Sequence, residues 1–194
     1  MMPGGRIFQS QSIVPLLVGD SLLLIRRGGD LASISFDPDE QSGTLEWKAE
    51  SGLNRIYEIK ATDHRLVLSG LRKTLDADGR SVDQSRVVVF DIRSGEKVGE
   101  FQPSTSEGIR WLTLDPTGRI VIGTRTSVEA FPMSGTGPPL WTNETPQAAA
   151  TMEGLMYGDQ LVGSLPEGAL VGFDLEYGSL RPGAFALSDT SRWL

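Results

Sequence analysis

The chain has 194 residues, enough for one domain with a hydrophobic core, and its net charge of −7 disfavours nucleic acid as a partner. It contains no cysteine, which excludes disulfides, thiolate metal sites and a cysteine nucleophile, while 23 glycines favour short strands and turns. Its single histidine, His64, excludes a histidine-based metal cluster and a Ser-His-Asp triad.

The first predicted elements are two strands, residues 13–18 and 22–25, joined by a turn at Gly19-Asp20. This apolar stretch is too short and too broken for a transmembrane helix, so no membrane-spanning segment is expected. It also lacks the charged leader and small-residue cleavage site of a signal peptide. We therefore expect a cytoplasmic protein, unless the sequence is a trimmed fragment of an exported one.

Four segments further along the chain share one pattern: a short apolar strand ending in phenylalanine, a turn with glycine, and a second aromatic residue. The first aromatics are Phe36, Phe90, Phe131 and Phe173, the turn glycines are Gly43, Gly95, Gly135 and Gly178, and the second aromatics are Trp47, Phe101, Trp141 and Phe185. The second aromatic follows the first by 11, 11, 10 and 12 residues. Because these features recur together at a nearly constant spacing, they indicate an internal repeat.

The period of the repeat indicates its architecture. Successive first aromatics are 54, 41 and 42 residues apart, and a propeller blade of four strands takes roughly 40–45 residues. The excess in the first interval lies in residues 71–85, a polar stretch that we interpret as an inserted loop. The sequence therefore predicts an all-β fold, a β-propeller segment of about four four-stranded antiparallel blades. The approximate blades are 12–48, 54–101, 108–143 and 150–187, within one domain over 1–194.

The eight aromatics have a structural explanation, because large rings between neighbouring sheets bury area and set the spacing of blades. The ends of the chain fall out of phase with a finished ring. Residues 5–10 read as a last strand without a blade before it, and residues 190–194 resemble the start of a further blade. We therefore expect an incomplete ring, completed by the remaining blades of a longer chain or by another copy in a homo-oligomer.

The order of strand, aspartate, glycine turn and final tryptophan resembles the tryptophan-docking repeat of the quinoprotein-like (PQQ-like) β-propellers. The nearest match is residues 35–37, Ser-Phe-Asp, followed by Gly43 and Trp47. The third repeat has Pro132 in place of aspartate, and the second and fourth repeats have phenylalanine in place of tryptophan. WD-repeat propellers fit less well, because no Gly-His opens a blade and no Trp-Asp closes one.

The resemblance implies three kinds of function: a quinone-dependent alcohol or sugar dehydrogenase, a non-catalytic assembly scaffold of the bacterial envelope, or a repeat segment of a larger protein. Dehydrogenases of this family bind PQQ and calcium over a complete eight-bladed ring, so no catalytic residue is carried across to a chain with about half the blades. We expect a non-catalytic scaffold for protein or peptide partners that binds no cofactor. The alternative is a fragment of a PQQ-dependent dehydrogenase.

One candidate binding site is a mouth of the propeller channel. Arg55, Arg110 and Arg192 occupy similar places where first strands begin, and Glu153 is nearly equivalent. First strands line the channel of a propeller, so these residues would suit an anionic ligand or an acidic peptide. The alternative is that they are solvated charges at strand ends or members of salt bridges.

A second candidate lies in the predicted insertion, where Asp76, Asp78 and Asp83 resemble the start of a calcium-binding loop. Such a loop ends in a glutamate that binds through both oxygens, and this sequence has none at that place. We therefore interpret the stretch as an acidic turn and predict no metal site.

Overall fold

The structure is a computed structural model that describes residues 13–37, 39–40, 42–115, 117–144, 155–157, 160–164 and 170–185. These residues form strands and the turns and loops that join them, and this part of the chain contains no helix. None of it therefore forms a helix long and apolar enough to span a membrane.

The strands of the described residues form four antiparallel sheets, each built from four consecutive strands. Blade 1 contains β1 (Ile13–Val18), β2 (Ser21–Arg26), β3 (Asp30–Asp37) and β4 (Ser42–Glu50). Blade 2 contains β5 (Arg55–Ala61), β6 (Arg65–Leu75), β7 (Ser81–Asp91) and β8 (Lys97–Phe101). Blade 3 contains β9 (Trp111–Leu114), β10 (Arg119–Gly123), β11 (Val128–Pro132) and β12 (Trp141–Asn143). Blade 4 contains β13 (Leu155–Tyr157), β14 (Gln160–Ser164), β15 (Leu170–Asp174) and β16 (Leu180–Phe185).

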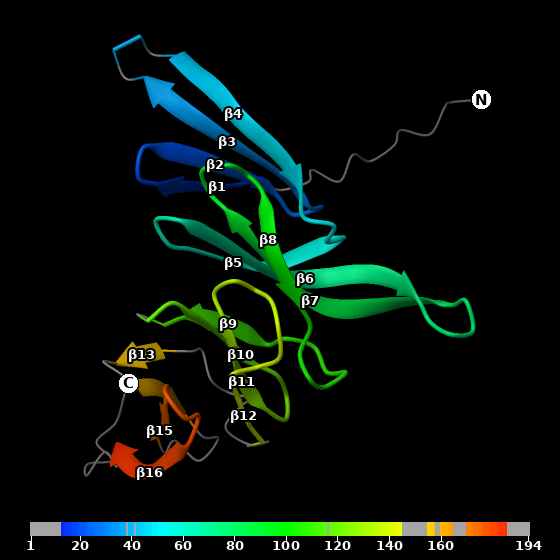
Figure 1. Ribbon diagram of the computed structural model, residues 1–194, viewed down its shortest axis with the longest axis vertical. Helices are drawn as coiled ribbons and strands as arrows, with labels where there is room; N and C mark the ends of the chain where they lie inside the picture. The colour runs from blue at the N-terminus through cyan, green and yellow to red at the C-terminus, as the bar shows by residue number, and fades with distance from the viewer. Residues whose placement is uncertain are drawn as a thin grey trace, which may run out of the picture.

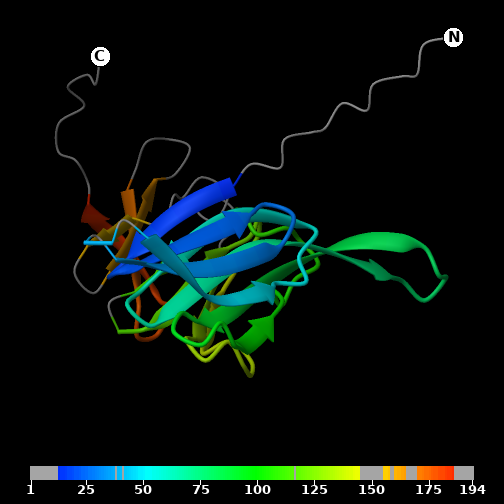
Figure 2. The ribbon, with the colours of Figure 1, turned by 90° about the horizontal axis from the view of Figure 1, so that it is seen from above.

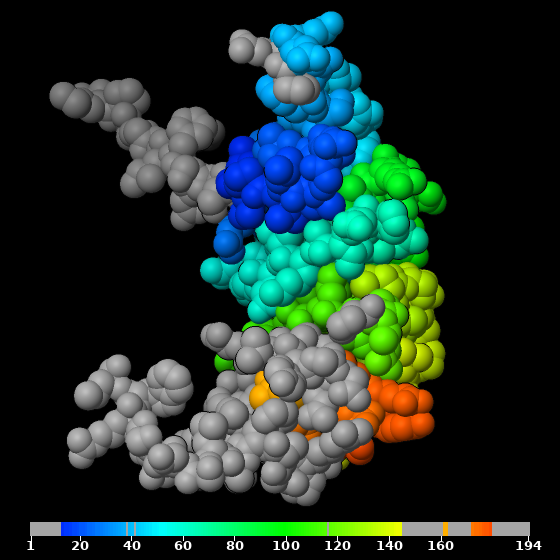
Figure 3. Space-filling model, turned by 90° about the vertical axis from the view of Figure 1, so that its left-hand side faces the viewer, coloured from blue at the N-terminus to red at the C-terminus, as the bar shows by residue number. Residues whose placement is uncertain are grey.

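The blades stack side by side as an open propeller. Figure 1 shows β1, β5, β9 and β13 along the inner curve of the stack, with β4 at its top and β16 at its bottom. Blades 1 and 4 lie at opposite ends of the longest axis, so the described chain does not close a ring (Figures 1 and 3). The predicted fold class, all-β with about four four-stranded blades, is confirmed.

Apolar side chains fill the three junctions between successive blades. Alternation along each strand sends neighbouring side chains to opposite faces, so a single blade contributes to two junctions. In blade 2, Val88 and Phe90 of β7 face blade 1, whereas Val87 and Val89 face blade 3. Junctions 1/2, 2/3 and 3/4 each have such a cluster, and all three include strand-end phenylalanines or the tryptophans that follow them.

The predicted insertion is not a loop. β6 and β7 continue to pair from Leu71↔Ser85 to Leu75↔Ser81, and only residues 76–80 form the turn. This extension of the hairpin, residues 72–86, is called the arm, and Figure 2 shows it projecting from the body of the molecule. The strands of the arm were not predicted because its sequence is polar. A two-stranded ribbon with solvent on both faces needs no alternation of apolar residues. The further strands expected at residues 5–10 and 190–194 lie outside the described residues.

Candidate functional site

Two tryptophans dock onto the blade that follows their own. Trp47 on β4 lies against the turn of blade 2, and its indole Nε1 donates a hydrogen bond to the carbonyl oxygen of Ile92 at 2.7 Å. A Cβ atom on Gly95 would lie 2.5 Å from the indole ring, so a larger residue does not fit beneath Trp47. Gly95 also has a φ of 70°, a conformation that glycine adopts without a steric cost.

The junction between blades 3 and 4 repeats this contact. The indole Nε1 of Trp141 donates to the carbonyl oxygen of Leu175 at 2.8 Å, and the ring covers Gly178, whose φ is 67°. In both junctions the glycine belongs to the blade that follows the tryptophan. We call this arrangement the Trp junction.

The aspartate before each of these turns holds the turn in shape. Asp91 Oδ1 accepts hydrogen bonds from the backbone N–H groups of Arg93 and Ser94 at 3.0 and 3.1 Å, and Asp91 Oδ2 pairs with the Arg65 guanidinium. Burial by itself would raise the pKa of Asp91, but the hydrogen bonds from Ser94, Arg65 and Arg93 hold it below its usual value. Asp174 accepts the equivalent backbone bonds ahead of Gly178.

Junction 2/3 is built differently. Phe101 of β8 stacks on Phe131 of β11, with ring centroids 3.9 Å apart and an angle of 18° between the planes. Gly99 of β8 lies against Ser134 and Gly135, so close that a Cβ atom at Gly99 would overlap the Ser134 carbonyl oxygen. We call this arrangement the Phe junction.

Phe36 departs from the expectation that every repeat aromatic packs between blades, because its side chain is 57% exposed. The reason is its position, since it faces away from blade 2 at the open end of the stack. Gly43 is also not in a turn, contrary to what the sequence suggested. It lies within β4, where it pairs with Phe36 of β3. Phe173 is fully buried as expected, whereas the side chain of Phe185 lies outside the described part of the structure.

The predicted channel mouth is only partly visible. Arg55 begins β5 and Arg110 directly precedes β9, so both stand at the start of a first strand, and both are exposed. The Arg55 guanidinium lies over the ring of Tyr57, 5.3 Å from its centroid. Glu153 and Arg192 lie outside the described residues, so the ring of charges remains a prediction.

The acidic residues of the arm belong to its turn and to one strand. Asp76 Oδ1 accepts hydrogen bonds from the backbone N–H groups of Asp78 and Arg80 at 2.9 and 2.8 Å, which closes the hairpin. Asp83 instead lies on β7, opposite Lys73. In the part of the chain that the structure describes, no group of three or more acidic or histidine residues is arranged to hold a metal ion.

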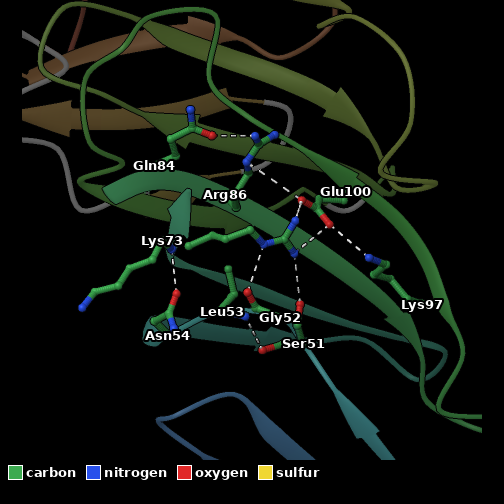
Figure 4. Close-up of polar contacts among 10 residues, drawn as sticks. Ser51, Gly52, Leu53, Asn54, Lys73, Gln84, Arg86, Lys97 and Glu100 are labelled. Carbon is green, nitrogen blue, oxygen red and sulfur yellow. Dashed lines mark hydrogen bonds and ion pairs between the residues drawn. The ribbon is translucent and has the colours of Figure 1, made fainter. Parts of the chain in front are cut away.

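A network of ion pairs and hydrogen bonds stabilises the base of the arm, and it was not predicted from the sequence. Arg72 binds both carboxylate oxygens of Glu100, at 2.5 and 3.0 Å, and its Nε donates to the carbonyl oxygen of Gly52 at 3.0 Å. Figure 4 shows Glu100 between Arg86 and Lys97, and Lys97 Nζ lies 3.1 Å from Glu100 Oε2. Arg72 and Glu100 are 28 residues apart, so no local pattern could pair them.

The same network shifts the ionisation of Glu100. Burial by itself would raise the pKa of Glu100, but hydrogen bonds from Lys97 and Arg72 outweigh that effect and lower it. The carboxylate is therefore held charged, and it connects the arm to the rest of blade 2.

A polar hollow of about 350 Å³ lies beside the arm. It is lined by residues 82–85 of β7 and by residues 102–107, which connect blade 2 to blade 3. The connector is held by Glu129, a fully buried residue whose carboxylate accepts hydrogen bonds from Ser104 N at 3.0 Å and from Ser127 Oγ at 2.9 Å. One wall of the hollow is thus fixed, and the other is a strand edge.

No family model matches this chain, and no curated protein sequence matches it. Among solved structures, the computationally designed Ika4 protein has a TM-score of 0.60 and 12% identity, over 90% of this chain and 99% of its own. BamB from Moraxella catarrhalis has a TM-score of 0.51 and 18% identity over 86% of this chain, which spans 46% of the BamB chain. Sqt1 from Saccharomyces cerevisiae has a TM-score of 0.46 and 11% identity, over 84% of this chain and 60% of its own. At such identities the likeness to Ika4 and BamB concerns the fold alone, that of a partial β-propeller.

Proposed function

We propose that this chain is a non-catalytic β-propeller module that binds protein or peptide partners, and that an extended partner segment docks along the arm. The observation that carries the proposal is the unpaired outer edge of β7. β8 pairs with β7 only from Val87 to Phe90, so among the described strands residues 81–86 pair with β6 alone and their other edge is unpaired. A free edge presents N–H and C=O groups that a partner strand can bind.

The hollow beside this edge favours a partner strand with basic side chains. Asp83 and Glu107 both line it, and the chain as a whole carries a net charge of −7. Opposite charges raise the association rate and fix the register of a docked strand. The ion pair between Arg72 and Glu100 supports the proposal further, because it holds the base of the arm in place. A rigid edge loses less conformational entropy on binding.

The test compares two fluorescent peptides, one of alternating lysine and valine and one of alternating glutamate and valine. Fluorescence anisotropy should show binding of the lysine peptide only. A variant in which Asn-Gly replaces residues 73–83 joins Arg72 to Gln84, which already face each other. This variant keeps the Arg72–Glu100 ion pair but loses residues 81–83 of the free edge, including Asp83, so it should bind the lysine peptide at least about tenfold more weakly.

Point substitutions separate charge from fold. Asp83→Lys, inside the hollow, should weaken binding of the lysine peptide by about tenfold. Asp78→Lys, in the exposed turn of the same arm, is the matched control and should leave binding unchanged. Equal binding of both peptides, or undiminished binding by the shortened arm, would refute the proposal.

We also propose that the chain belongs to the quinoprotein-like propellers, which the Trp junctions of Trp47 and Trp141 support. The alternative function, a fragment of a PQQ-dependent dehydrogenase, has a direct test. The protein is incubated with PQQ and calcium, and dye-linked oxidation of alcohols and sugars is measured. Our proposal expects no turnover and no bound chromophore.

A further inference from the structure

The face of blade 1 that points away from blade 2 is mainly apolar, with the Arg26–Asp30 ion pair at one end, and no other described sheet covers it. The pairs Leu17↔Leu22, Leu22↔Ile34 and Ile34↔Leu45 place one row of side chains across all four strands. Leu17 is 72% exposed, and Leu45, Ile13 and Phe36 are exposed as well. A continuous apolar face of this kind marks an interaction surface.

The same positions of blade 2 show what such a face is for. In the strand register, Leu22, Ile34 and Phe36 correspond to Leu68, Val88 and Phe90. The three residues of blade 2 are at most 1% exposed, because blade 1 covers them. The open face of blade 1 therefore has the composition of a junction, and its expected occupant is another blade.

The turn of blade 1 shows which kind of junction it can form. In both Trp junctions glycine stands four residues after the aspartate, as in Asp91 and Gly95, and a Cβ atom there would collide with the tryptophan. Four residues after Asp37 the sequence has Gln41. Blade 1 therefore lacks the glycine of a Trp junction. Phe36 has the strand position of Phe90 in a Trp junction and of Phe131 in the Phe junction, so the missing glycine is what favours a Phe junction.

Blade 4 carries the other half of a Phe junction in its last strand. β8, which forms the Phe junction inside the chain, reads Gly99-Glu100-Phe101, and β16 reads Gly183-Ala184-Phe185. The glycine is required in β8, because the neighbouring turn packs directly on it. Neither strand that supplies a docked tryptophan has glycine two residues before it, since those positions are Leu45 and Pro139.

The backbone register of β16 agrees with this assignment. Phe101 pairs with Val87, three residues before the buried phenylalanine of its sheet, and Phe185 pairs with Leu170, three residues before Phe173. The register position of Phe185 is thus that of Phe101. Trp47 has it too, because it pairs with Ser33, three residues before Phe36, so Gly183 rather than the register indicates a Phe junction. Blade 4 and blade 1 can therefore supply the two halves of one junction. They lie at opposite ends of the described chain, and Figure 3 shows blade 1 at the top.

We propose that blade 4 of a second copy covers the open face of blade 1, so that two copies close one ring. The four described sheets of each copy give eight blades, which is within the usual range of propellers. A twofold axis relates the copies, and each of the two seams is a Phe junction between Phe36 of one copy and Phe185 of the other. Trp and Phe junctions then alternate around the whole ring.

Light scattering coupled to gel filtration tests the assembly. The full chain should elute as one species of about 42 kDa, twice the chain mass of 21.0 kDa. Phe36→Asp should shift it to the mass of one chain, because the charge would be buried in the seam. Leu75→Asp is the matched control, since Leu75 is 73% exposed on the arm and away from the face, and this variant should remain a dimer.

Cross-linking tests which blade occupies the face, and the absence of cysteine in the natural sequence makes it specific. Phe36→Cys and Phe185→Cys are prepared as separate proteins. After mixing, unfolding and refolding together, mild oxidation should give a covalent dimer, whereas either protein alone should give none.

Four results would overturn the proposal: a monomeric full chain, larger species of mixed size, a Phe36→Asp variant that stays dimeric, or cross-linking of Phe36→Cys with itself. A monomer would mean that other residues of the same chain or another protein cover the face. Larger species of mixed size would mean that the ends join without closing a ring. Circular dichroism confirms that each variant is folded, which is expected because Phe36 is exposed in the single chain.

Discussion

Glycine residues at turns decide how closely neighbouring blades approach. At Gly95 two requirements coincide, a φ of 70° and the absence of a side chain beneath Trp47. Gly79, in the turn of the arm, has the first requirement only, because its φ is 75° and nothing lies within 4 Å of a Cβ atom placed there. The two residues therefore separate the cost of backbone strain from the cost of a lost docking contact.

We expect Gly95→Ala to destabilise the protein more than Gly79→Ala. Both substitutions place alanine at a positive φ, which costs about 1–2 kcal/mol. Gly95→Ala also forces the indole of Trp47 away from its site, which adds about 1–3 kcal/mol. Urea denaturation monitored by circular dichroism measures both free energies, and equal values would show that Trp47 does not depend on the glycine.

At the scale of elements, the arm is a hairpin that outgrows its sheet and depends on charges at its base. Glu100 accepts hydrogen bonds from Arg72 and Lys97, and these hold its pKa below the ordinary value of 4.5. A carboxylate with a lowered folded-state pKa stabilises the fold above its unfolded-state pKa. That stabilisation is lost as the pH falls through the folded-state value.

We therefore expect Glu100→Gln to reduce the free energy of unfolding by about 1–3 kcal/mol at neutral pH. The difference from the natural protein should shrink as the pH falls below 4.5, because the carboxyl of the unfolded chain then binds a proton. It should level off once the folded carboxyl, whose pKa is lower, is neutral as well. Glu96→Gln, an exposed glutamate in the preceding turn, is the control and should have little effect at any pH. A pH-independent loss in Glu100→Gln would show that packing rather than charge holds the arm.

At the scale of the whole molecule, the stack of blades is open, and its stability depends on what covers its two ends. An array in which each unit touches only its neighbours leaves its terminal faces in water unless a cap or a partner covers them. The proposed second copy would cover the apolar face of blade 1 and the far side of blade 4 in both chains.

If two copies close the ring, thermal stability depends on concentration. The Tm of the full chain should rise with protein concentration, because mass action favours the folded dimer. The Tm of Phe36→Asp should be lower and should not change with concentration. A Tm that is independent of concentration in the natural protein would contradict ring closure by a second copy.

Local features of the sequence were enough to predict most of the strands and their grouping into blades. Alternating apolar residues and glycine turns are local features, and the repeat of Phe90, Phe131 and Phe173 reports one packing position in each blade. Local patterns also explain the limits of prediction. The polar arm was expected to be a loop, because strands with water on both faces carry no apolar signal.

Contacts between segments far apart in the chain set which residues meet across blades and which face remains open. The pairing of Arg72 with Glu100 and the choice between a Trp and a Phe junction depend on backbone segments far apart in the chain. Phe36 and Phe90 each stand directly before an aspartate near the end of a strand, yet one is 57% exposed and the other 1%. The physical reason is that burial depends on a neighbouring sheet, which no pattern within a single strand specifies.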